Sequence, residues 1–424
     1  MSDTTRRVFL QSTAAAAATA TLLPGAFAAA DDTLKIGLIG CGGRGTQAAI
    51  EALRADPKVK LVAMADAFMD QLESSLTSIK SKKANVADKV DVAPDRKFDG
   101  FDGYKKVIEL CDVVLLCTPP GFRPIHLKAA IEAGKHVFCE KPVAVDVTGA
   151  KSVIETAKLA KQKNLSICSG YCWRYFSPMR ETVKRVHDGL IGDISTVHIT
   201  YLAGSLWHRG SDPKWTPMQY QMRNWYYYTW LSGDFIVEQH CHNFDKLNWV
   251  LKGKEPVAAI GVGGRQQRRD PMYGHIYDHF ATTLEFEGGL RAFSFCRQMD
   301  GTEWDVNDHI IGTRGEAHLM KWLVKGADGK ELSFADKTAK SMYQVEHDEL
   351  FAGIRSGKLI NDGESAAHST LLAIMAREAA YTGARITWKN LLASKQNLAP
   401  AQYDWDAKIN DKPAVPMPGS YKFA

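Results

Sequence analysis

The fold of this protein is decided close to the start of the chain, by the sequence LKIGLIGCGGRG at residues 34–45. Its first half is a short apolar run, as expected of a buried strand in a parallel sheet. Its second half contains glycines that permit a tight turn and the close approach of a ligand to the backbone: Gly40, Gly42, Gly43 and Gly45. Residues 46–55 then have a helical pattern, and a second apolar run at 59–65 ends at Asp66. Strand, glycine turn, helix, strand and acid in this order predict a dinucleotide-binding βαβ unit.

This unit also predicts which nucleotide binds. The loop, which includes Arg44, is expected to hold the pyrophosphate at the N-terminus of the helix. Asp66 lies about twenty residues beyond the last glycine, where an acid hydrogen-bonds the ribose hydroxyls and repels a 2′-phosphate. The next two residues, Ala67 and Phe68, supply no arginine to bind such a phosphate. We therefore expect NAD rather than NADP.

Strands and helices continue to alternate after the first unit. An apolar run at 113–117 precedes Thr118 and Pro119, a helical stretch follows at 125–133, and the run at 136–139 precedes Glu140 and Lys141. This alternation predicts a doubly wound parallel sheet, an α/β Rossmann fold. Because ligands bind beyond the carboxyl ends of such strands, we expect these four residues to line the cofactor site with Asp66.

The pattern changes in the second half of the chain. Several β-like runs follow one another with little helix between them: 194–201, 257–262, 281–286 and 290–296. A long apolar helix is expected at 363–382. We predict an NAD-binding domain at 31–160, an α+β domain with a largely antiparallel sheet at 161–398, and a Pro-rich arm at 399–424 lying on a neighbouring surface.

The first thirty residues resemble a bacterial twin-arginine export signal. TRRVFLQ at 5–11 precedes an apolar, alanine-rich run at 12–23 and a small-residue cleavage site at 24–28. Such a signal implies that the protein is exported already folded to the periplasm, where free NAD is scarce. We therefore expect a tightly bound cofactor that is regenerated on the protein, and no stable membrane insertion after processing.

Composition narrows the classes of partner. The chain has 53 Lys and Arg against 48 Asp and Glu, and this small excess is spread along the sequence. It does not indicate a nucleic-acid-binding protein. The eight cysteines include CSGYC at 168–172, which lacks zinc-ligand spacing, and we expect most thiols to be unpaired.

Several short motifs together resemble the glucose–fructose oxidoreductase, inositol dehydrogenase and MocA (Gfo/Idh/MocA) family. They are AGKHV at 133–137, EKP at 140–142, YCWRY at 171–175 and IGDI at 191–194. The resemblance implies a Rossmann domain, a sheet domain, an NAD-dependent oxidoreductase, and a homo-dimer or homo-tetramer paired through the open face of the second sheet.

The family also has a D-x-G-x-H segment beside its motif lysine, and EQHCH at 238–242 matches it here. The resemblance carries the lysine to Lys141 and the histidine to His242, while Glu238 replaces the aspartate and His240 the glycine. Removal of hydride from a secondary alcohol needs a base and a nearby cation. We expect His242 to be the base, Lys141 the cation, and Glu238, one helical turn earlier, to orient the imidazole.

A metal cluster is the rival interpretation of the same segment. Glu238, His240 and His242 are suitable zinc ligands, with His275 or His279 as a further ligand. This spacing is common by chance, and hydride transfer in this fold needs no metal. We therefore predict none.

A dense aromatic and polar stretch at 207–230 indicates a carbohydrate pocket, because aromatic faces stack on sugar rings and polar side chains bind hydroxyls. A protein core or a subunit interface would also explain it. The residues expected to bind substrate are Arg174, Tyr175, Arg223, Trp225, His240, Asp245 and Arg297.

Three functions follow from these patterns. The leading one is an NAD-dependent oxidoreductase acting on a secondary hydroxyl of a sugar or glycoside with internally recycled cofactor. The second is an NAD-dependent glycosidase that oxidises, eliminates, hydrates and reduces without net redox change. The third is a sugar- or nucleotide-binding protein without turnover.

Overall fold

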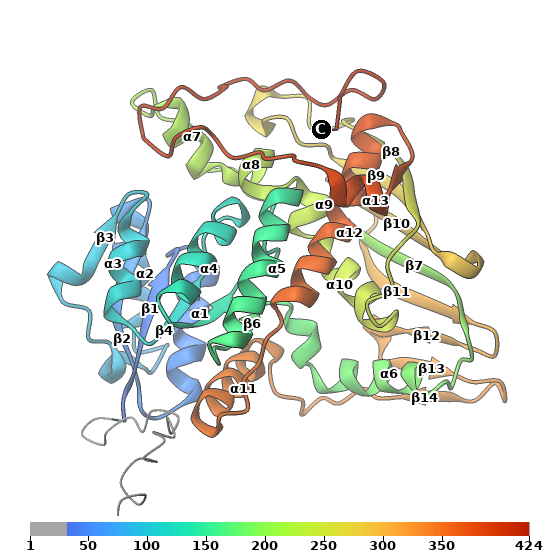
Figure 1. Cartoon of the computed structure of the whole chain (residues 1–424), viewed down its shortest axis with the longest axis horizontal. Helices are drawn as coiled ribbons and strands as arrows, with labels where there is room; N and C mark the ends of the chain where they lie inside the picture. The colour runs from blue at the N-terminus through green and yellow to red at the C-terminus, as the bar shows by residue number, and fades with distance from the viewer. Residues whose placement is uncertain (1–31, 424) are drawn as a thin grey trace, which may run out of the picture. The chain divides into compact units, whose positions relative to one another are not determined.

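Six parallel strands form the first sheet, in the order β3-β2-β1-β4-β5-β6 (Figure 1). The structure is a computed structural model that describes residues 32–423, so the predicted export signal lies outside the described residues. The strands are β1 (Leu34–Ile39), β2 (Val59–Asp66), β3 (Lys97–Asp99), β4 (Val113–Leu116), β5 (His136–Cys139) and β6 (Ile167–Ser169). The helices between them are α1 (Gly43–Ala55), α2 (Met69–Ile79), α3 (Gly103–Leu110), α4 (Arg123–Glu132) and α5 (Val147–Gln162). The predicted doubly wound sheet is confirmed.

The apolar runs form strands because they are covered on both faces. Ile36, Leu38 and all four residues of β4 are fully buried, as a parallel sheet between helices requires. The sheet extends past the expected boundary at residue 160, because β6 pairs in parallel with β5. Late helices also return to this domain: α11 (Met342–Ser356) packs on α1, and α12 (Gly363–Thr382) packs on α5.

The second sheet has nine strands, in the order β14-β13-β12-β11-β7-β10-β9-β8-β15. They are β7 (Ile194–Ala203), β8 (Ala258–Gly264), β9 (His279–Glu285), β10 (Arg291–Gln298), β11 (Asp305–Gly312), β12 (Glu316–His318), β13 (Leu323–Lys325), β14 (Glu331–Ser333) and β15 (Ile386–Thr387). Every neighbouring pair is antiparallel except β7 and β10, which run in parallel. This confirms a largely antiparallel sheet, and α12 begins and ends where the sequence predicts.

The two faces of this sheet differ. Val197, Ile199 and Ala292 are fully buried on one face, which α10 (Cys241–Val250) and α12 help to cover. Alternate residues on the same strands point the other way, and Phe293 and Phe295 remain 36% and 39% exposed. The remaining helices are α6 (Ser177–His187), α7 (Pro217–Arg223), α8 (Thr229–Ser232), α9 (Phe235–Glu238) and α13 (Trp388–Ala393).

The Pro-rich tail after residue 398 lies on its own chain. In Figure 1 its dark red trace leaves α13, passes α8 and α7, and returns toward α12. Thr216 Oγ1 donates to the carbonyl of Trp405 at 2.8 Å, and Gln221 Nε2 donates to that of Asn410 at 2.7 Å. The tail is therefore a packed part of this chain, which differs from the arm on a neighbouring surface that its composition suggests.

Two further expectations concern thiols and membranes. All eight cysteines are free, which confirms the prediction for the thiols. Within residues 32–423, none of the helices combines the length and the apolar composition needed to cross a bilayer.

Candidate active site

A cavity of about 690 Å³ opens at the carboxyl ends of the parallel strands. One side is made by every residue that the sequence assigns to the cofactor: Gly40, Gly42, Gly43, Arg44, Gly45, Asp66, Thr118, Pro119, Glu140 and Lys141. The other side comes from the second domain, including Glu238 and His242. The cavity therefore joins the expected nucleotide site to the expected reaction site.

The glycine loop has the shape that a pyrophosphate requires. Gly40 has φ +94°, and a Cβ there would lie 2.5 Å from the backbone of Cys117 and Thr118. A Cβ on Gly45 would lie 1.9 Å from the Gly40 carbonyl oxygen, so this glycine lets α1 pack against the loop. Gly42 and Gly43 face open space, which leaves the loop backbone accessible to a ligand. These residues fit a dinucleotide.

Asp66 is held in place by the backbone around it. Its two carboxylate oxygens accept hydrogen bonds from the amides of Cys41, at 2.6 Å, and Phe68, at 2.9 Å. Burial raises the pKa of Asp66, although these two bonds oppose the shift. The amide of Cys41 belongs to the glycine loop, so loop and acid form one rigid unit at the end of β2.

Arg44 ties the loop to distant parts of the chain. Its guanidinium contacts Glu51 at 2.8 Å, Glu140 at 2.5 Å and Glu346 at 2.6 Å. Glu346 lies on α11, 302 residues later, and its pKa is raised by burial. Nothing in the local sequence pattern marks Glu51 or Glu346 as partners of the loop, and sequence reasoning missed both.

Lys141 and Glu238 form a buried ion pair on the cavity wall. Lys141 Nζ donates to the Glu238 backbone carbonyl at 2.6 Å and to its Oε1 at 3.0 Å. Burial alone would lower the pKa of Lys141, but Glu238, together with Cys241 and Glu140, outweighs it and the pKa is raised. Lys141 is therefore a fixed cation at neutral pH.

This pairing corrects the predicted role of Glu238. The expectation that Glu238 orients His242 assumes one continuous helix. Instead α9 ends at Glu238 and α10 begins at Cys241, so the two side chains do not stack one turn apart. Glu238 positions Lys141.

His242 lies on the cavity wall as a neutral imidazole. Burial, and secondarily the charge of Lys141, lowers its pKa well below the ordinary value. Its buried Nδ1 has no hydrogen-bond partner among residues 32–423. An unprotonated imidazole beside a fixed cation can accept a proton from a bound hydroxyl.

His240 has the opposite environment and does not line the cavity. Its Nε2 lies 2.8 Å from Ser294 Oγ and its Nδ1 lies 3.2 Å from Asn243 Oδ1. Burial lowers its pKa to about 3. The predicted contact of His240 with substrate is therefore not what the structure shows.

The same placement argues against the rival metal cluster. Glu238, His240 and His242 are not among the described groups whose ligand atoms approach within 4.8 Å of one another. His275 bonds Thr229 at 2.7 Å, and His279 bonds Asp278 at 2.8 Å.

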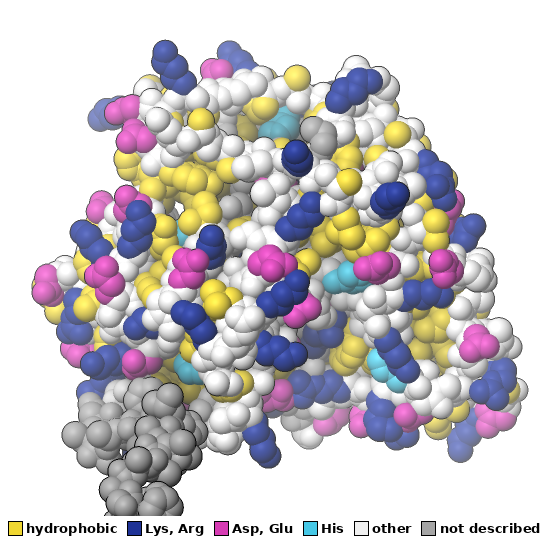
Figure 2. Space-filling view, in the orientation of Figure 1, with side chains coloured by type: hydrophobic (Ala, Val, Ile, Leu, Met, Phe, Trp, Pro, Cys, Tyr) yellow, Lys and Arg dark blue, Asp and Glu magenta, His cyan; other side chains and the backbone are white. Residues whose placement is uncertain are grey.

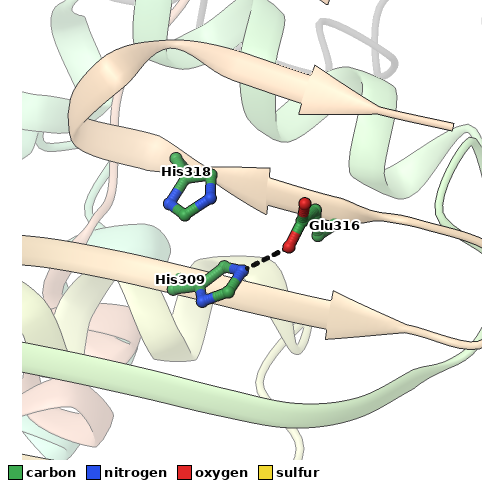
Figure 3. A group of neighbouring side chains, drawn as sticks. All are labelled: His309, Glu316 and His318. Atoms are coloured by element: carbon green, nitrogen blue, oxygen red, sulfur yellow. Dashed lines mark hydrogen bonds and ion pairs between the residues drawn. The ribbon is translucent and has the colours of Figure 1, made fainter. Parts of the chain in front are cut away.

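Another group does approach within that distance, on β11 and β12, but it lies outside the cavity (Figure 3). His309 Nε2 contacts Glu316 Oε2 at 2.9 Å, and the His309 and His318 rings stack at 4.1 Å with an angle of 11°. In parallel rings the nitrogen lone pairs run side by side and do not converge on one point. We assign no metal to it.

Four other residues expected to bind substrate have structural partners and do not line the cavity. Arg174 forms a two-pronged ion pair with buried Asp245 at 2.8–3.1 Å. Tyr175 Oη donates to Asp362 at 2.8 Å, and Arg297 Nε bonds Thr302 Oγ1 at 3.0 Å. The polar groups of these four side chains therefore form contacts within the fold.

The aromatic stretch does reach the cavity. Trp207, Arg209, Trp215, Arg223 and Trp225 all line it. Arg223, however, pairs with Asp70 at 3.0 Å and lies 3.9 Å from the centroid of the Phe68 ring. It therefore lies at the Asp66 end of the cavity, beside the expected nucleotide and away from Lys141.

Comparison with known proteins identifies the family. Residues 34–167 match the oxidoreductase family with an NAD-binding Rossmann fold, and residues 179–318 match the GFO/IDH/MocA C-terminal domain. The chain belongs to the Gfo/Idh/MocA family, and it is an NAD-dependent oxidoreductase.

Two relatives illustrate the range of that family. Inositol 2-dehydrogenase of Rhizobium meliloti is 26% identical over 67% of this chain and 74% of its own. The 2,7-anhydro-N-acetylneuraminate hydratase of Escherichia coli is 27% identical over 50% of this chain and 52% of its own.

Solved structures share the fold at lower identity. The scyllo-inositol dehydrogenase of Lactobacillus casei, with bound NAD(H) and scyllo-inositol, has a TM-score of 0.63 at 20% identity and covers 84% of this chain and 99% of its own. The aldose-aldose oxidoreductase of Caulobacter crescentus has a TM-score of 0.64 at 19% identity and the same coverage.

Proposed function

We propose that this protein oxidises a secondary hydroxyl of a sugar or glycoside. The observation that carries the proposal is the pairing of a fixed cation, Lys141, with a neutral imidazole, His242, in the cavity that the glycine loop also lines. Bound NAD would supply the hydride acceptor. His242 takes the hydroxyl proton, Lys141 stabilises negative charge on the oxygen, and Glu238 holds Lys141 in position.

The carbohydrate assignment rests on the other wall of the cavity. Trp207 and Trp225 lie edge to face at 5.8 Å, and Arg209 lies 4.7 Å from the centroid of the Trp207 ring. Such a wall offers apolar faces for ring C–H groups and a guanidinium for hydroxyls. The names of the relatives, which include inositol and aldose enzymes, support the same class. Reduction of bound cofactor by a panel of aldoses and inositols tests it.

We propose further that the mature protein works in the periplasm with retained NAD. The support is the sequence at 1–30, which has the parts of a twin-arginine signal. A second, oxidised sugar would then take the hydride back. Denaturing the purified protein should release NAD(H), and release of NADP would contradict the role given to Asp66.

A homo-dimer or homo-tetramer is the assembly we propose, formed through the open face of the second sheet. Ile260, Val262, Phe293 and Phe295 are each at least 36% exposed on its strands. Burying such side chains against a second copy is favourable. A stable monomer in light scattering at micromolar concentration would exclude this assembly.

Redox-neutral cleavage or hydration of a glycoside is the second candidate. The observation that favours it is the relative named as a hydratase, whose net reaction adds water. Aryl glycosides distinguish the two functions. Aglycone release without added NAD supports the second candidate, whereas a ketosugar with stoichiometric reduction of bound cofactor supports the oxidoreductase.

A further inference from the structure

The cavity wall beside Asp66 is built from three segments that are far apart in the sequence. Phe68 and Phe101 come from the first domain, and both line the cavity. Arg223, on α7, lies against the Phe68 ring at 3.9 Å and pairs with Asp70 at 3.0 Å. Trp405, from the C-terminal tail, packs behind both phenylalanines, with ring centroids 5.1 Å from Phe68 and 4.5 Å from Phe101.

The tail is held at this place by bonds along its length. Leu398 N donates to Asp146 Oδ2 at 2.8 Å, and the Pro416 carbonyl accepts from Tyr277 Oη at 2.7 Å. Between these anchors, alternate residues from Tyr403 to Ile409 are partly buried and those between them are exposed. The tail thus keeps one side toward the protein, and it makes a turn at Trp405 and Asp406, where Ala407 N donates to the Asp404 carbonyl at 3.1 Å. Figure 2 shows hydrophobic side chains gathered between α4 and the α7–α8 segment, along the path of the tail.

The tail also connects the first domain to the α7 segment. The Trp405 ring packs on the first domain, while its carbonyl accepts from Thr216 Oγ1, and Thr216 is the N-cap of α7. Tyr403 similarly lies between Phe122, at 5.3 Å, and Trp230, at 6.5 Å. Moving Phe68 or α7 away from the cavity therefore means separating the Trp405 ring from its neighbours or breaking its bond to Thr216.

We propose that the tail, through Trp405, is a latch that retains NAD. An acid at the end of the second strand binds the ribose hydroxyls of a dinucleotide, so the wall of Phe68, Phe101 and Arg223 faces the adenosine end. Trp405 holds that wall closed from behind without touching the nucleotide, which makes it a positioning residue. This inference rests on the proposed retention of NAD and names the part of the chain that causes it.

The test compares dissociation of NADH from full-length mature holoenzymes. Bound NADH is displaced with excess NAD and its fluorescence is followed by stopped flow. Trp405→Ala loses both ring contacts that hold this wall in place, so it should release NADH about fivefold or more faster than the parent. Met417→Ala is the matched control, because this residue of the same tail is 63% exposed, and its rate should not change.

Three further measurements keep the outcome interpretable. Trp405→Phe keeps an aromatic ring and should restore most of the slow release. If the alanine variant does not fold, Trp405→Leu replaces it, because leucine keeps apolar bulk without an aromatic ring and should also release NADH faster than the parent. At saturating NAD the turnover of Trp405→Ala should remain within about twofold of the parent. A lower melting temperature with an unchanged NADH release rate would show a purely structural role and overturn the latch.

The latch and the proposed function fail in different ways. Rapid loss of NADH from the parent protein contradicts retention, whereas the latch is judged by the ratio of variant to parent. A Trp405→Ala rate within twofold of the parent overturns the latch and leaves the catalytic proposal untouched.

Discussion

The nucleotide half and the reaction half of one cavity differ in how directly the sequence predicts them. In the nucleotide half, every residue expected at the cofactor lines the cavity, from Gly40 to Lys141. In the reaction half, Lys141, Glu238 and His242 do meet, but Glu238 has a different partner from the one expected and His240 is in the core. The positions of residues in the nucleotide half follow from where the parallel strands end. Those in the reaction half depend on where one helix ends and the next begins, and on tertiary contacts between side chains.

His240 and His242 show this difference within three residues. His240 is bonded to Ser294 and Asn243 in the packed interior. His242 lines the cavity, and its Nδ1 has no hydrogen-bond partner among the described residues. The identical residue type at nearly the same position has a structural role in one case and a proposed catalytic role in the other.

The largest effect is expected in the reaction half. Lys141→Ala or His242→Ala should each reduce turnover by about a hundredfold or more, the usual contribution of general acid–base groups. Bound nucleotide measured after denaturation should be unchanged, because the glycine loop and Asp66 are intact. Chelators should have no effect. Full activity of His242→Ala with cofactor bound would disprove the proton-transfer role.

A smaller effect, confined to binding, is expected in the nucleotide half. Asp66→Ala removes a carboxylate that would bond the ribose, and such charged bonds are worth roughly 1.5–3 kcal/mol. NADH affinity in a fluorescence titration should fall by about ten- to a hundredfold, and the ratio of NADH affinity to NADPH affinity should decrease. Asp99→Asn, at the exposed end of β3, is the control and should bind normally. Equal affinity in the Asp66 variant would remove the argument for NAD specificity.

His240→Ala should lower stability rather than turnover. It leaves Ser294 Oγ and Asn243 Oδ1 without their buried partner, which costs roughly 2–3 kcal/mol in the free energy of unfolding. Urea denaturation should detect this loss, while turnover of the folded fraction stays within about threefold of the parent. A hundredfold loss of turnover at full stability would instead place His240 in the reaction half.

The smallest effect is a displacement of the pH profile. Since burial and Lys141 lower the pKa of His242, the base stays unprotonated below the ordinary value near 6.5, and the acid limb of kcat/KM should lie well below that pH. Glu238→Gln removes the carboxylate that helps to raise the pKa of Lys141. The alkaline limb of the same profile should therefore move to lower pH, while the acid limb stays in place. An acid limb centred near 6.5 would contradict the neutral buried imidazole.

Lowered pKa values of buried histidines also make the stability of the fold depend on pH, because these residues bind protons more readily in the unfolded chain. His126, His240 and His275 have pKa values of about 3, 3 and 4 in the folded protein. Below about pH 6.5 the unfolded chain binds protons that the folded chain does not, so stability falls as pH falls. Each histidine contributes up to about 1.4 kcal/mol per pH unit in that range.

The Rossmann sheet, the glycine loop, Asp66 and the strand-end residues Thr118 and Lys141 can all be predicted from local sequence patterns. This was possible because apolar strands between helices form a parallel sheet, and the residues that follow each strand must then meet at one edge. The helix at 363–382 can also be predicted from the sequence, since its apolar residues form a long uninterrupted pattern.

Contacts between residues far apart in the sequence could be found only from the folded structure. Lys141 pairs with a carboxylate 97 residues away, Arg44 with one 302 residues away, and Trp405 with phenylalanines of the first domain. Composition marked the tail as irregular, but its path depends on surfaces that exist only after both domains have folded. Burial, and not residue type, then separates His240 from His242, because a side chain's environment is set by packing that no local pattern encodes.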